Sequence, residues 1–141
     1  MKVGYLNRGV VFLIFPEELN ITDKIKGLSA NKKHTIQLLA GGASAKDLLG
    51  ISTKGMDHLY QTSYNMLKNN RIDESIDAFT FLVTLDPSVG AYWLNYGIAL
   101  QLSGSFEMAL NAYEMAAIIE VEDPVPYFYL AKCLFAMNDK E

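Results

Sequence analysis

Small residues recur at one position of a repeating apolar pattern, 34 residues apart, at Ser63, Gly97 and Ala131. One bulky apolar residue stands four positions before each of them, and another stands three positions after it. These flanking residues are Leu59, Trp93 and Tyr127 on the earlier side and Met66, Leu100 and Leu134 on the later side. Spacings of three and four residues place side chains on one face of a helix. The pattern therefore predicts three equivalent helices, each with a small residue in its contact face.

A turn signal and an acidic residue follow each of these helices. The turn residues, which tolerate a left-handed backbone, are Asn70, Gly104 and Asn138, and the acidic residues are Asp73, Glu107 and Glu141. Carboxylates suit the positive N-terminal end of a helix, so a second helix is expected after each turn. A unit of two helices with this period is the tetratricopeptide pattern. The predicted helices cover residues 53–68, 72–85, 88–102, 105–120 and about 123–137.

The predicted fold is all-α, a right-handed tetratricopeptide superhelix with two full repeats and half of a third, over residues 53–141. Each small residue lets the two helices of its repeat cross closely. Terminal repeats need a neighbour or a polar outer face. The half repeat ends in apolar residues, so we expect that the protein continues beyond Glu141 or that this face meets another chain.

Residues 1–52 form an N-terminal arm in this scheme. Its apolar run Val10–Phe15 has six residues, far fewer than the ~20 that cross a bilayer, and it lacks the cleavage site of a signal peptide. Further along, we expect a short helix, a break at Gly41-Gly42, a second short helix, and Ser52 or Thr53 capping the first repeat helix. The apolar surface of the arm predicts a homodimer formed through it.

Composition narrows the kinds of partner. Half of the residues are hydrophobic, which either core packing or an exposed apolar groove explains. The net charge of −4 and the pI near 5.1 argue against a nucleic-acid surface, which needs clustered Lys and Arg. The single cysteine excludes an internal disulfide framework and suits a reducing cytoplasm. We therefore expect a cytoplasmic protein that neither binds nucleic acid nor inserts into a membrane.

Residues with catalytic or metal-binding chemistry are scarce. His34 and His58 have no cysteine or carboxylate neighbours at metal-ligand spacing. Cys133 lies on an apolar helix without a nearby base, as expected for a buried, inert thiol. The sequence predicts no enzyme, no metal and no cofactor, and a function in binding.

The concave side of the superhelix is the predicted binding surface. If the small residues face the partner helix, the residues three before them and one and four after them face the hollow. The predicted binding residues are Tyr60, Tyr64, Leu67 and Lys68 in the first repeat, Leu94, Ile98, Gln101 and Leu102 in the second, and Phe128, Lys132 and Phe135 in the third. So much apolar surface indicates a groove for an extended apolar peptide, although single members of the set are also explained by ordinary packing.

Four motifs carry a resemblance to a known family. They are LLAGGASAKDLLGIS over residues 38–52, Leu-Tyr-x3-Tyr from Leu59, Gly-x-Phe-x-x-Ala-x-x-x-Tyr from Gly104, and Pro-x-Pro from Pro124. In order and spacing they resemble the class II chaperones of bacterial type III secretion, which guard hydrophobic translocator proteins. The chain departs from that pattern in its apolar start, in Ala43 where a threonine is expected, and in its incomplete third repeat.

The resemblance implies a bacterial cytoplasmic chaperone that holds an extended segment of a translocator in the groove and dimerises through its N-terminal helices. The alternative is a generic tetratricopeptide scaffold or adaptor that binds a peptide of another protein. Scaffolds that grip a C-terminal carboxylate present donors and positive charge. The corresponding positions here include Tyr60, Tyr64, Val125 and Tyr129, so that version is disfavoured.

Overall fold

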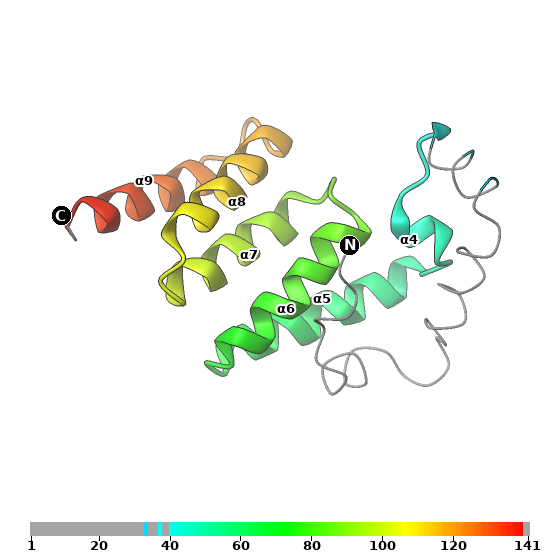
Figure 1. The fold of residues 1–141 in the computed structure, drawn as a ribbon, viewed down its shortest axis with the longest axis horizontal. Coiled ribbons are helices and arrows are strands. Elements are labelled where there is room, and N and C mark those ends of the chain that lie inside the picture. Colours follow the sequence, from blue (N-terminus) through cyan, green and yellow to red (C-terminus); the bar gives the residue numbers. More distant parts are fainter. Residues whose placement is uncertain (1–32, 34–36, 38–39, 140–141) are drawn as a thin grey trace.

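The computed structural model describes Lys33, Gln37 and residues 40–139 of the chain (Figure 1). In that part every regular element is a helix and none is a strand, which confirms the all-α prediction. Our expectations for Val10–Phe15, for His34 and for most of the first arm helix lie outside the described residues.

Five helices form the repeat array: α5 Thr53–Lys68, α6 Ile72–Leu85, α7 Gly90–Leu102, α8 Phe106–Ile119 and α9 Val125–Asn138. Helices α5 and α6 form one antiparallel pair, α7 and α8 form the next, and α9 follows α8 (Figure 1). This arrangement is two full tetratricopeptide repeats and half of a third, as predicted. Helix α4, at the end of the arm, lies at one end of the array, and α9 lies at the other end (Figure 1).

The prediction of left-handed turn residues was right at two of the three positions and wrong at the third. Asn70 and Gly104 have φ of 60° and 86°, so both repeats turn through a left-handed residue. Asn138 does not, because α9 remains helical through it, and the cap is at Asp139. Helix α7 begins two residues later than predicted. The reason is that Asp86 Oδ1 accepts hydrogen bonds from the Ser88 amide and hydroxyl, which keeps Ser88 in a turn.

Large side chains fill the gaps that the small residues leave. Ser63 is fully buried, and its hydroxyl donates to the Leu59 carbonyl at 2.8 Å. A methyl group on Gly97 would lie 2.5 Å from Cε1 of the buried Tyr113 ring, so only glycine fits there without a shift. The prediction that small residues allow a close helix crossing is confirmed in the first two repeats. In the half repeat it stays a prediction, because Ala131 is exposed and no second helix of that repeat is among the described residues.

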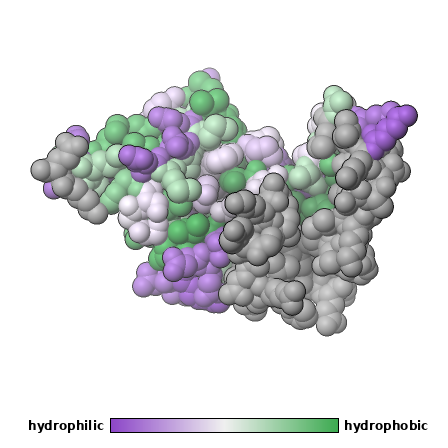
Figure 2. Space-filling view, in the orientation of Figure 1, coloured by the Kyte–Doolittle hydropathy of each residue, from purple (hydrophilic) through white to green (hydrophobic). Residues whose placement is uncertain are grey.

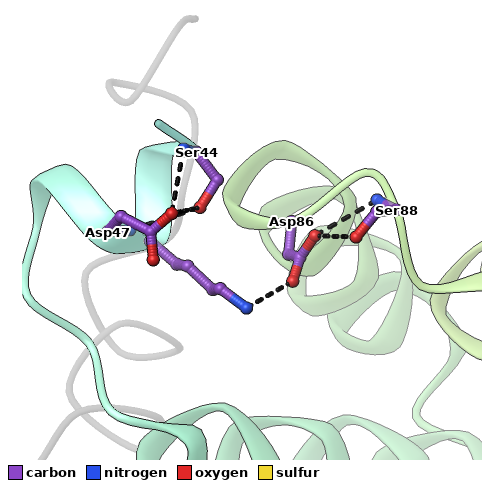
Figure 3. A network of polar contacts seen from close by, with 5 residues as sticks. Ser44, Asp47, Asp86 and Ser88 are labelled. Atoms are coloured by element: carbon purple, nitrogen blue, oxygen red, sulfur yellow. Dashed lines mark hydrogen bonds and ion pairs between the residues drawn. The ribbon is translucent and has the colours of Figure 1, made fainter. Parts of the chain in front are cut away.

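The short helix α4, Ala45–Leu48, leads from the arm into the repeats. Ser44 and Asp47 form a capping box at its start, and Lys46 Nζ lies 2.7 Å from Asp86 Oδ2 at the end of α6 (Figure 3). Burial acts to raise the pKa of Asp86, but hydrogen bonds from Lys46 and Ser88 outweigh it and lower that pKa. After α4, Ser52 accepts from the Gly55 amide and caps α5, as expected. The last arm residues are thus fixed to the first repeat.

Candidate functional site

An aromatic surface begins on α5. The rings of Tyr60 and Tyr64 stack with their centroids 6.3 Å apart, and Lys68 Nζ lies 5.8 Å from the centre of the Tyr64 ring. Tyr64 is 38% exposed, as a binding residue must be. Leu67 is half-buried and packs against the core of the first repeat. It is therefore a packing residue as well as a candidate lining residue.

Tyr60 is held from three sides. Its ring meets Phe79 edge-on at 6.3 Å and Tyr92 at 5.5 Å. Asn95 Nδ2 donates to the Tyr60 hydroxyl at 3.0 Å and to the Ala91 carbonyl at 2.8 Å. Burial raises the pKa of Tyr60 above its ordinary value. The first repeat is thereby joined to the second by a polar contact on the predicted binding side.

Helices α7 and α9, with Tyr113 of α8, form a small pocket next along the array. Its volume is about 120 Å³, and its lining residues are Ile98, Gln101, Leu102, Tyr113, Tyr129 and Lys132. Four of these six residues belong to the predicted binding set, and the structure brings them together from two repeats. Leu94, also predicted, is half-buried and packs against the core of the second repeat.

The polar groups of this pocket are oriented by aromatic neighbours. The Tyr113 hydroxyl donates to Gln101 Oε1 at 2.8 Å. Lys132 Nζ lies 5.4 Å from the Phe128 ring centre and 5.5 Å from the Tyr129 ring centre. Cation–π contacts of this kind hold an ammonium group over the ring faces without neutralising it.

Exposed apolar side chains continue from the end of α7 along α9. Phe135 is 70% exposed, and Phe128 and Leu102 are also mostly exposed. Figure 2 shows hydrophobic residues gathered on the surface over α8 and α9. Large exposed apolar patches mark sites of interaction, so these exposed side chains make α9 a candidate part of a binding surface.

Three residues of the site were not in the predicted binding set: Asn95, Tyr113 and Tyr129. Asn95 and Tyr129 occupy the same repeat position, two residues before Gly97 and Ala131. Comparing that position between repeats would have found both. The Tyr113 ring packs against Gly97, and its hydroxyl also donates to Gln101.

The described residues offer no group of three or more His, Cys, Asp or Glu side chains that could hold a metal ion. Cys133 is buried, and its thiol contacts the Phe106 carbonyl at 3.5 Å. Burial raises the pKa of that thiol, which disfavours a nucleophilic thiolate. Among the described helices, none has both the length and the apolar character needed to cross a membrane.

Known proteins resemble the chain in sequence. Low calcium response locus protein H of Yersinia pestis is 27% identical over 101 residues, which cover 72% of this chain and 60% of that protein. Chaperone protein SicA of Salmonella typhimurium is 31% identical over 97 residues, or 69% of this chain and 59% of that protein. The chain thus spans about three fifths of the length of these curated relatives. No protein-family model matches it.

Solved structures resemble it in fold. PcrH in complex with the chaperone binding region of PopD has a TM-score of 0.62 and 28% identity, and the match covers 64% of this chain and 68% of that one. The translocator chaperone SycD of Yersinia enterocolitica has a TM-score of 0.65 at 23% identity, covering 68% and 72% of the two chains. At that identity the second likeness concerns the fold alone.

Proposed function

Because its homologues are type III secretion chaperones, including translocator chaperones, we propose that this protein is a chaperone of the same kind. In this proposal it binds an extended segment of a hydrophobic translocator along α5, α7 and α9, and keeps the translocator soluble and competent for secretion. Its expected location is the bacterial cytoplasm.

The observation that carries this proposal is the set of exposed or half-buried apolar and aromatic side chains on the first helices of the repeats. Tyr64 on α5, Ile98 and Leu102 on α7, and Phe128 and Phe135 on α9 are all available to a ligand. Extended apolar segments dock into such grooves through side-chain pockets, and their backbone groups need polar partners. Tyr60, Asn95 and Gln101 supply polar groups that are already oriented.

Binding to translocator peptides tests the proposal directly. Fluorescein-labelled 15-residue peptides that tile the hydrophobic translocators of the source bacterium would be titrated with the full chain, and anisotropy recorded. We expect one internal segment to bind. Exclusive binding of acidic C-terminal peptides would instead support a generic adaptor, and binding of no peptide would contradict the groove.

The proposed homodimer through the arm is a separate part of the function. Its basis is the apolar sequence of Val10–Phe15, Ile36, Leu38 and Leu39. Sedimentation of the full chain and of a variant lacking residues 1–35 should show a shift toward monomer in the shorter protein. An unchanged dimer would place the interface elsewhere.

A further inference from the structure

The pocket between α7 and α9 presents nitrogen donors and no acid. None of its six lining residues is Asp or Glu. The acceptor of the Gln101 amide is used by the Tyr113 hydroxyl, so its Nε2 group is left to donate. The second donor is the ammonium group of Lys132. Both donors belong to residues on the predicted binding side.

Lys132 carries a charge without a described counter-charge. In the described part of the chain the ion pairs are Lys46–Asp86 and Arg71–Glu74, and neither involves Lys132. The Lys132 ammonium lies over the rings of Phe128 and Tyr129 instead. This positive group belongs to a chain with a net charge of −4, so the local sign of the pocket is opposite to that of the whole protein.

From this arrangement we infer that the pocket binds the side-chain carboxylate of an internal Asp or Glu of the bound segment. The inference rests on the proposed function, because it names a feature of the same ligand. Gln101 Nε2 and Lys132 Nζ would each donate to the carboxylate, while Ile98 and Leu102 contact an apolar neighbour of that residue. Charge-assisted hydrogen bonds are about twice as strong as neutral ones, so a carboxylate fits this donor set better than a backbone carbonyl does.

An internal carboxylate fits better than a C-terminal one because of what flanks Lys132. Phe128 stands four residues before it on α9 and Phe135 three residues after it, and both are largely exposed. An acidic residue with apolar residues on both sides can use both rings. A chain that ends at its carboxylate can use only one of them.

The test starts from the translocator segment found by tiling. Each position of that peptide, acetylated and amidated at its ends, would be replaced in turn by Glu and by Gln. We expect one position at which Glu binds about fivefold more tightly than Gln, the scale of a partly exposed ion pair. That preference should shrink when NaCl is raised from about 50 mM to about 500 mM.

Variants of the chain then locate the effect. Lys132→Gln should remove the preference for Glu, because the Glu peptide should lose more affinity than the Gln peptide does. Lys54→Gln, which removes one exposed charge from α5, should keep the preference. A peptide truncated to end at that position with a free carboxylate should bind less tightly than the internal Glu peptide.

The outcomes separate the two ideas. If Glu and Gln bind equally at every position, or Lys132→Gln keeps the preference, the carboxylate pocket is wrong while the groove stands. If the truncated peptide binds more tightly than the internal one, the source of the carboxylate is a chain end, and the inference as stated is overturned. If tiling finds no segment at all, the proposed function has failed, and the pocket with it.

Discussion

Helices α7 and α9 occupy the same place in successive repeats, yet their matching residues have different surroundings. Leu100 on α7 is 2% exposed, whereas its counterpart Leu134 on α9 is 44% exposed. Gly97 lies against the Tyr113 ring, whereas Ala131 is exposed. Helix α8 covers α7, and no described helix covers α9 in the same way. The repeat pattern thus marks which face can be buried, but burial itself needs a second helix.

The opposite end of the array shows how a covering segment buries and stabilises a terminal repeat. Leu49 and Ile51, which follow α4, are buried in the core of the first repeat. The Lys46–Asp86 ion pair holds α4 to the end of α6 (Figure 3). Repeat arrays are stabilised by interfaces between neighbours, and uncovered ends are their weakest units. We therefore expect α9 to open more readily than α5 or α7.

The largest effect should come from comparing substitutions of a buried aromatic residue, Phe79, and a partly exposed one, Tyr64. Phe79 is fully buried, so Phe79→Ala should cost ~3–5 kcal/mol and unfold much of the protein. Tyr64→Ala should change the melting temperature by only a few degrees, because the ring is partly exposed. It should, however, weaken binding of the translocator segment at least about tenfold. Normal folding of the first variant or normal binding of the second would mean that the two faces are wrongly assigned.

Matched leucines on α7 and α9 give the next comparison. Leu100→Ala should destabilise the protein by ~2–5 kcal/mol, as expected for a buried leucine. Leu134→Ala should cost less than about 1 kcal/mol in the same urea titration, because much of that side chain is already in water. Equal losses would show that another chain or segment covers α9 in solution.

The small residues allow a comparison in the opposite direction. Gly97→Ala places a methyl group against the Tyr113 ring and should cost ~1–3 kcal/mol. Ala131→Leu adds more atoms, but at an exposed position, and should stay within about 0.5 kcal/mol of the parent. Thermal melts followed by circular dichroism would measure both. A large loss for Ala131→Leu would indicate a hidden neighbour of α9.

The ion pair at the covered end should give the smallest effect. Lys46→Met should cost about 1 kcal/mol at neutral pH, compared with Lys54→Met as a control for charge loss. Hydrogen bonds lower the pKa of Asp86 below its ordinary value of 3.8 in the folded protein. Its contribution is therefore fully present above that value and is lost as the pH falls through the lowered pKa. The melting temperatures of Lys46→Met and the parent should converge in that acidic range, and a constant gap would exclude this ion pair as the cause.

The sequence predicted the repeat helices well because their signals are local. The bounds of α5 and α6 were predicted to the residue, since Ser52 and Asn70 mark a start and a turn that neighbouring residues determine. The start of α7 was wrong because the side-chain turn at Asp86 competes with the helix.

The candidate site was less accessible to prediction. The repeat register placed Ile98, Gln101 and Lys132 in the same region, and the structure brings them into one pocket. Their role in binding stays a prediction. The contacts from Asn95 to Tyr60 and from Tyr113 to Gln101 join different helices, so they depend on tertiary packing and on no spacing within one helix.

The hydrogen bond between Asn95 and Tyr60 affects the rate and the free energy of peptide binding. It spans 35 residues of sequence and joins two repeats. The Tyr60 rotamer is therefore selected when the protein folds, before any partner arrives. Ordering a flexible side chain at an interface costs about 0.5–1.5 kcal/mol. For Tyr60 this free energy is lost when the protein folds and not when the peptide binds. Because this surface is ordered before binding, most of the conformational change on binding takes place in the peptide.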